Sequence, residues 1–245
     1  MWIKAPEYPL QYSWSSHLNF LYQSGKIFIM DNHLAAAWCW IQTLDPSKSC
    51  NFYHIDGHYD LQGDAPSVDR QIIDVGFDLK NCSLDAYLNL KYPMADGEMA
   101  ALFRYDTYIL NLQKVYKDFF DRKIFATQRI GNRKDVFLDV ANGDCEKEAH
   151  ELLLQLETDI KDTNEKPWIV NLDLDYFFIE KEEDCVQYLT DDYIVALCDA
   201  IRKSMPDIAV VTIALSPDFC GGWEKSHRIA KLVSDCLGID FELNV

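Results

Sequence analysis

The sequence lacks the features that divide a chain or carry it into a membrane. It has no Pro/Gly/Ser-rich linker, no low-complexity run and no internal repeat, so we expect residues 1–245 to form a single domain. No apolar run is long enough to cross a bilayer, and the N-terminal residues lack the plan of a signal peptide. We therefore expect no membrane partner.

Three common catalytic signatures are also missing. The chain contains no Gly-x-Gly-x-x-Gly, no Walker A loop and no Gly-x-Ser-x-Gly elbow, so dinucleotide, nucleoside-triphosphate and serine-hydrolase functions have no support. Its eight cysteines include no Cys-x-x-Cys pair, and most stand in apolar surroundings, where a buried free thiol is the usual state. This pattern favours the reducing cytoplasm.

Positive charge is scarce. The chain has 40 acidic and 23 basic residues, a formal net charge of −17. Such a field repels nucleic acid, which we therefore do not expect as a partner. It favours a cationic substrate or metal ions, although solubility is the simpler explanation for most of the charge.

Buried strands alternate with amphipathic helices along the chain. We expect strands over 26–30, 52–55, 168–172, 207–216 and 241–245, and helices over 34–43, 145–162, 190–205 and 223–237. This alternation predicts an α/β protein with three layers (α/β/α) and a mainly parallel sheet. In such folds ligands bind beyond the carboxyl ends of the strands, which is where the Asp and His residues of this chain gather.

The first gathering is the stretch 51–60, Asn-Phe-Tyr-His-Ile-Asp-Gly-His-Tyr-Asp. Asp56, His58 and Asp60 follow an apolar strand at alternate positions, and alternate side chains of extended backbone leave on one face. Gly57 would let the chain turn there. Oxygen and imidazole donors together suit Mn(II), Zn(II), Fe(II) or Ni(II); the alternative is a polar turn with capping Asp residues and a surface His.

Two further strand ends carry the same donor types. Asp173 and Asp175 follow the strand 168–172 at alternate positions, and His33 follows the strand 26–30. For His33 the alternative is a packed residue beside a helix cap. The complete set contains four carboxylates, which would repel one another without metal and are too many for one divalent ion. We therefore predict two ions, which can share and activate one water at neutral pH.

This set resembles the ureohydrolase superfamily, which includes arginases, agmatinases and their deacetylase relatives. Ligands there come as a His after a strand, then Asp-x-His-x-Asp, then Asp-x-Asp. The matching segments, all between residue 31 and about 220, are His33, Asp56-Gly-His-Tyr-Asp60 and Asp173-Leu-Asp175. The resemblance implies an arginase/deacetylase-like fold with two Mn(II) ions per chain. Asp56 and Asp173 would bridge the ions, with His33 and Asp60 on one ion and His58 and Asp175 on the other.

His54 and the short chain are most similar to the divergent peptide arginases, which convert arginine residues of ribosomally made peptides to ornithine. The resemblance implies an arginine-containing peptide as substrate, hydrolysed to ornithine and urea, with Asp60 orienting or deprotonating the attacking water. His54 precedes Asp56 by two residues. It could bond a ligand carboxylate or relay protons, or it could be a satisfied core histidine.

The chain departs from arginases where they hold free arginine. Positions 214–216 carry no carboxylate to hold the guanidinium, and no His follows Asp60 in the segment where arginases keep a proton shuttle. Asp218 or Glu224 could pair with the guanidinium; the alternatives are a turn residue and a helix-start Glu. These gaps favour arginine within a peptide over free arginine.

Two other functions stay open on the sequence alone. One is a metal-dependent deacetylase or amidohydrolase that works through a single zinc. The other is a non-catalytic metal-binding protein of the same fold, against which the intact ligand set counts. The number of bound ions separates the first from an arginase-type enzyme. The sequence predicts no oligomeric state.

Overall fold

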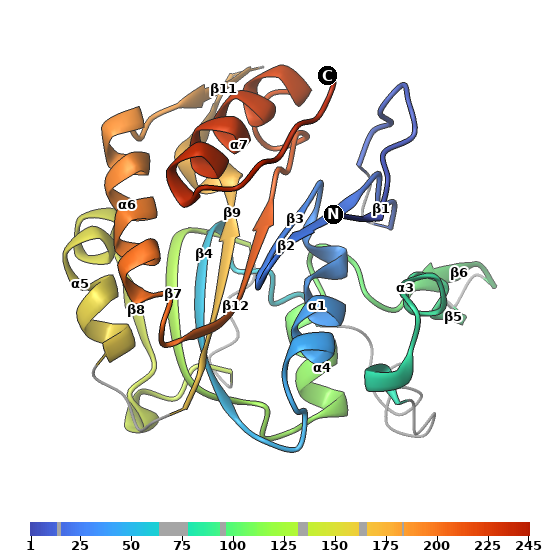
Figure 1. Cartoon of the computed structure of the whole chain (residues 1–245). Coiled ribbons are helices and arrows are strands. Elements are labelled where there is room, and N and C mark those ends of the chain that lie inside the picture. Colours follow the sequence, from blue (N-terminus) through green and yellow to red (C-terminus); the bar gives the residue numbers. More distant parts are fainter. Residues whose placement is uncertain (14–15, 64–77, 94–96, 132–136, 162–165, 183) are drawn as a thin grey trace.

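A mixed sheet forms the centre of the computed structural model (Figure 1). The structure describes residues 1–13, 16–63, 78–93, 97–131, 137–161, 166–182 and 184–245. In spatial order the strands are β1 (Trp2–Lys4), β2 (Leu21–Ser24), β3 (Ile27–Met30), β12 (Ile208–Ala214), β9 (Trp168–Asp173), β4 (Cys50–His58), β7 (Phe120–Ile130) and β8 (Cys145–Lys147). From β3 to β8 every neighbouring pair is parallel, and β1 and β2 add an antiparallel edge.

Helices cover both faces of the sheet (Figure 1). One face carries α5 (Ala149–Lys161), α6 (Asp191–Ser204) and α7 (Trp223–Leu237), and the other carries α1 (Ala36–Thr43) and α4 (Tyr108–Val115). The predicted three-layer α/β architecture with a mainly parallel sheet is confirmed. Within the described residues, no helix has the length and apolar character needed to span a membrane.

The strands are apolar throughout because both of their faces are buried. In β4, Tyr53 and Ile55 pack into the core beneath α5, α6 and α7, whereas Phe52 packs against Trp40 of α1 on the other face. Side chains alternate between the two cores along each strand. Phe52, His54 and Asp56 occupy alternate positions of β4, so their side chains point to the same side of the sheet.

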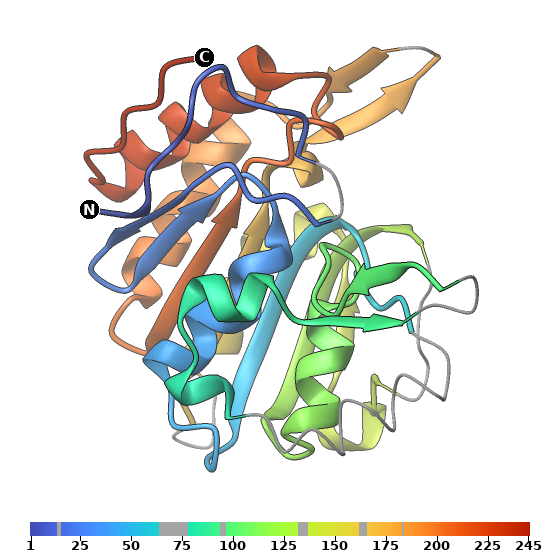
Figure 2. The ribbon, with the colours of Figure 1, turned by 90° about the vertical axis from the view of Figure 1, so that its right-hand side faces the viewer.

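Two hairpins lie outside the main sheet. The first joins β5 (Lys91–Pro93) to β6 (Met99–Ala101), and it follows the short helix α3 (Leu84–Leu88). The second joins β10 (Phe178–Lys181) to β11 (Asp184–Gln187) and extends beside α7 (Figure 2). The first belongs to the irregular stretch after β4, of which residues 64–77 and 94–96 lie outside the described part.

The prediction of a last strand over 241–245 is wrong. These residues pair with no strand in the part of the chain that the structure describes, yet Phe241 and Leu243 are buried. Phe241 packs against Phe20 and Tyr22, so the alternation of apolar and polar residues reflects side-chain burial rather than a backbone ladder.

The carboxyl ends of the central strands lie level with one another. Ile55 of β4 is paired with Leu172 of β9, and Asp173 is paired with Ala214 of β12. This register brings Asp56 and Asp173, the residues at the ends of adjacent parallel strands, side by side.

Candidate metal centre

The six predicted ligands meet at the carboxyl ends of β3, β4 and β9. Two groups of potential metal donors are present, and within each group the donor atoms lie within 4.8 Å of one another: the first consists of His33, Asp56 and Asp60, and the second of Asp56, His58 and Asp175. Asp56 belongs to both groups. Asp173 completes the set, because its Oδ2 lies 3.4 Å from the Nδ1 atom of His33.

His33 stands at the middle of the first group. The cap of its short 3-10 turn is Asn32, whose side chain accepts a hydrogen bond from the backbone N–H of Leu34. The His33 ring is 1% exposed, and its Nδ1 lies 3.4 Å from carboxylate oxygens of Asp56, Asp60 and Asp173. His33 is therefore not only a packed residue beside a helix cap, because its ring faces three carboxylates.

The β4 segment keeps an extended backbone through its first two ligands. The N–H of His58 donates to Oδ1 of Asp56 over 2.6 Å, and the pairing with β7 shifts register between these residues. The chain turns at Asp60, which has a φ of 51°. The predicted turn at Gly57 is wrong, because Gly57 lies within β4 and its φ is not positive.

The β9 segment reaches the same site through a different backbone. Asp173 is the last residue of the strand and caps a 3-10 turn (Leu174–Phe177) by accepting the N–H of Asp175 over 3.0 Å. Asp175 therefore projects from a turn, and the predicted alternation along a strand does not explain it. The hydroxyl of Ser216 donates to the second oxygen of Asp173 at 2.5 Å.

Close contact between the two segments depends on Gly57. The carboxylate of Asp175 accepts the Gly57 N–H at 2.8 Å and contacts the Nδ1 of His58 at 2.8 Å. A Cβ at position 57 would lie 3.1 Å from Oδ1 of Asp175. Glycine is needed here for a close approach rather than for a turn.

Burial makes the clustered charges expensive. Burial and the neighbouring Asp56 charge raise the pKa of Asp60 to about 8, and burial and Asp175 raise that of Asp173. Although burial acts in the opposite direction, the hydrogen bond to Asp175 raises the pKa of His58 to about 12. Bound protons thus reduce the repulsion between the clustered carboxylates, and bound cations would reduce it in their place.

An unsatisfied atom supports the fit of cations to this site. Oδ2 of Asp56 is buried and has no hydrogen-bond partner within the part of the chain that is described. It lies 3.4 Å from His33 Nδ1 and 3.6 Å from His54 Nε2. Buried carboxylate oxygens are rarely left without a partner, and Asp56 belongs to both donor groups.

A row of polar side chains crosses the sheet one step below Asp56 and Asp173. Its members are His54 of β4, Asn171 of β9 and Thr212 of β12, which are paired in register and fully buried. The indole N–H of Trp40 donates to Thr212, whose hydroxyl donates to Asn171 over 2.6 Å. The carbonyl of His58 lies 3.1 Å from Nε2 of His54 and can only accept, which fixes the direction of this whole chain of hydrogen bonds.

That direction determines the tautomer of His54. The amide of Asn171 donates to Nδ1 of His54 over 3.0 Å, so Nε2 carries the proton and donates to the carbonyl of His58 over 3.1 Å. Burial also lowers the pKa of His54 to about 4, which keeps the ring neutral. Both nitrogens are engaged, an arrangement that favours the core-histidine alternative over the predicted proton relay.

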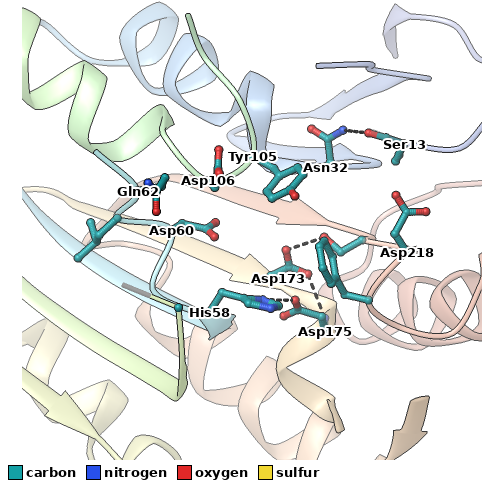
Figure 3. Close-up of a pocket in the computed structure, with 14 residues that line it drawn as sticks. Ser13, Asn32, His58, Asp60, Gln62, Tyr105, Asp106, Asp173, Asp175 and Asp218 are labelled. Atoms are coloured by element: carbon teal, nitrogen blue, oxygen red, sulfur yellow. Dashed lines mark hydrogen bonds and ion pairs between the residues drawn. The ribbon is translucent and has the colours of Figure 1, made fainter. Parts of the chain in front are cut away.

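A cavity of about 240 Å³ opens onto the donor cluster. Figure 3 shows Asp60, His58, Asp173 and Asp175 along it, with Asp218 on the side opposite Gln62. Glu224 does not line this cavity; it is exposed in the first turn of α7, in agreement with the helix-start alternative. Of the two carboxylates considered for the substrate, the structure brings only Asp218 to the site.

Several residues of the site were not predicted. Tyr105 and Phe219 line the cavity, and their rings meet edge to face with centroids 5.6 Å apart. Asn171 and Thr212 had a detectable signal, because polar residues inside buried strands need partners. Tyr105 had none, since it precedes α4 in a segment without a motif.

Comparisons with known proteins identify the fold. No protein-family model and no curated protein matches the chain. Among solved structures, it is similar to an arginase superfamily protein from Trypanosoma cruzi, with a TM-score of 0.52, 13% identity, and coverage of 85% of this chain and 62% of that one. It is also similar to the arginase of Entamoeba histolytica in complex with L-ornithine, with a TM-score of 0.52, 11% identity, and coverage of 87% and 69%.

The fold of the chain is therefore that of the arginases. Identities of 11–13% establish this shared architecture alone. The chain spans 62% of the length of the Trypanosoma cruzi protein, so activity and substrate are separate questions.

Proposed function

We propose that the chain is a metal-dependent hydrolase of the arginase superfamily, and that residues 1–245 form one arginase-like domain. Its substrate would be an arginine residue within a peptide, which it would convert to ornithine with release of urea. The observation that carries this proposal is the pair of donor groups that share Asp56 at the strand ends of an arginase fold.

Two Mn(II) ions fit this donor set best. Oxygen donors with a few imidazoles suit such ions, and two groups that share Asp56 favour two ions over a single zinc. When bound, the ions would supply Lewis-acid activation of water at neutral pH. The residues that would hold them are Asp56 and Asp173 for both ions, His33 and Asp60 for one, and His58 and Asp175 for the other.

The charge of the cavity lining favours a cationic substrate group that has no carboxylate of its own nearby. Carboxylates line it at positions 60, 106, 173, 175 and 218, and no Lys or Arg does so among the described residues. Two bound ions would neutralise the carboxylates at 60, 173 and 175, and Asp106 pairs with Arg104 over 3.1 Å. Asp218 is therefore the carboxylate left to attract a guanidinium and to repel the α-carboxylate of free arginine. An arginine within a peptide carries no such carboxylate.

The residues around the cavity would then bind the substrate and transfer the protons. Asp218 pairs with the guanidinium through charge-assisted hydrogen bonds, and the rings of Tyr105 and Phe219 contact the alkyl chain. Asp60 takes a proton from the attacking water as the new C–O bond forms. It returns this proton to the side-chain nitrogen as the C–N bond breaks, so that urea and a primary amine are produced.

Urea release tests this function. The manganese-loaded protein is incubated with an arginine-containing peptide and, separately, with free arginine. We expect urea from the peptide, matched by a mass loss at arginine, and none above background with the Asp56→Ala variant. Absence of urea from both substrates, with two ions bound per chain, would refute the guanidino hydrolase.

A further inference from the structure

A second hollow adjoins the candidate active-site cavity. It has a volume of about 450 Å³, and Asp218 lines both spaces. Its walls come from three parts of the chain: the β10–β11 hairpin with Glu180 and Asp184, the loop 217–222 after β12, and Tyr12 near the N-terminus. Figure 2 shows the hairpin and the N-terminal segment at the same end of the molecule.

The first cavity is smaller than the sites that enclose a whole drug-sized ligand. Its volume of about 240 Å³ lies below the range of about 300–1,000 Å³ that encloses a whole drug-sized ligand. A peptide whose arginine enters this cavity must therefore place its neighbouring residues outside it. The second hollow is where they arrive if the peptide passes Asp218.

The hollow favours positive charge. The carboxylates that line it are those of Asp218, Glu180 and Asp184, and no Lys or Arg lines it among the described residues. Asp184 is neutralised by Lys225, with 2.6 Å between Nζ and Oδ1. Glu180, on the exposed part of β10, has no ion-pair partner within the described ranges. Trp223 adds an aromatic surface of the kind that attracts cations.

We propose that this hollow binds a second basic side chain, a lysine or arginine of the same peptide whose reacting arginine occupies the first cavity. This inference rests on the proposed function for the identity of the first side chain. Its own support is that Asp218 lines both spaces and that the carboxylate of Glu180 lines the hollow without an ion-pair partner among the described residues. The substrate would thus be a peptide with two nearby positive charges.

Direct peptide binding tests the proposal independently of turnover. The probes are short blocked peptides with one arginine and one lysine, the lysine placed at successive positions on either side, each matched by a peptide with norleucine instead. Binding is measured by fluorescence anisotropy at low salt, with and without manganese. In at least one register, we expect the lysine peptide to bind about two- to fivefold more tightly.

Two variants separate the hollow from the acidic surface in general. Glu180→Gln removes one charge from the hollow and should abolish most of the lysine preference. Asp85→Asn removes one charge from an exposed site in α3 that lines neither space and should preserve the preference. A lysine preference that survives Glu180→Gln, equal binding of all matched pairs, or no binding of any peptide would overturn the inference.

Urea release from the same peptides distinguishes the two proposals. Tighter binding of the lysine peptide without urea release would support the second site and refute the guanidino hydrolase. Urea released equally from lysine and norleucine peptides, with no preference in binding, would leave the hydrolase and remove the second site.

Discussion

The two ligand segments after β4 and β9 look alike in sequence but differ in backbone. Each places an Asp at the end of an apolar strand and another ligand two residues on. β4 itself continues past Asp56 to His58, whereas after β9 the chain closes at once into a 3-10 turn that carries Asp175. Strand alternation accounts for the first arrangement and not for the second.

A local hydrogen bond is common to both segments. Asp56 accepts the N–H of His58 over 2.6 Å, and Asp173 accepts the N–H of Asp175 over 3.0 Å. Asp side chains readily bond the backbone two residues ahead. The spacing of the motif therefore follows from this short-range bond, which tolerates either a strand or a turn.

The strongest test of the comparison removes the shared ligand. Asp56 belongs to both donor groups and Asp60 to only one. We expect Asp56→Ala to lose both ions, and Asp60→Ala to keep one, as measured by equilibrium dialysis with elemental analysis. Asp173→Ala should resemble Asp56→Ala. Undiminished metal content in Asp56→Ala and Asp173→Ala would remove the assignment of the site.

The polar row beneath the site supports the β4 segment specifically. Asn171→Ala would remove one hydrogen bond from each of His54, Tyr108 and Thr212. We expect a loss of about 2–4 kcal/mol in the free energy of unfolding, together with weaker metal binding, because the carbonyl of His58 loses its fixed donor.

Asn111 offers a matched control for that experiment. It is also fully buried, its amide donates to the carbonyl of Leu102, and it belongs to neither donor group. Asn111→Ala should reduce stability but leave the manganese affinity of the folded protein unchanged. Equal loss of metal affinity in both variants would show that the row contributes general stability only.

The contact between the two segments is tested by a double-mutant cycle. Gly57→Ala places a methyl group 3.1 Å from Oδ1 of Asp175, and we expect it to destabilise the metal-free protein by about 1–3 kcal/mol in chemical unfolding. In an Asp175→Ala background the same change should cost less than half as much. An identical cost in both backgrounds would place the strain elsewhere.

Residue type and strand-end position were sufficient to predict which Asp and His side chains gather at the site, because metal chemistry limits which side chains can serve as donors. The backbone that presents them was not predictable to the same degree. Gly57 was expected to turn the chain, but its role depends on Asp175, more than a hundred residues away along the chain. Asn171 and Thr212 were visible as polar residues in apolar strands, yet their partners follow only from the strand register.

The choice between Asp218 and Glu224 also required the three-dimensional structure. Both follow β12, and either could have paired with a guanidinium on chemical grounds. The loop after β12 turns back over the site, whereas α7 starts at Trp223 and directs Glu224 to the surface. A separation of six positions thus decides between the cavity and solvent.

The smallest expected effect concerns Asp218, which follows β12. Unlike the proposed metal ligands on the other two segments, Asp218 would contact the substrate only. Burial and the nearby Asp31 raise the pKa of Asp218 to about 6, so its carboxyl is charged above this pH and neutral below it. Asp218→Asn should retain both ions. Its KM for the arginine peptide should exceed that of the unmodified protein by about two- to fivefold above pH 6. Below that pH the two KM values should converge, since the protonated carboxyl resembles the amide. The ratio of the two KM values cancels any effect of pH on metal loading, and a ratio that stays constant across this range would remove Asp218 from the substrate site.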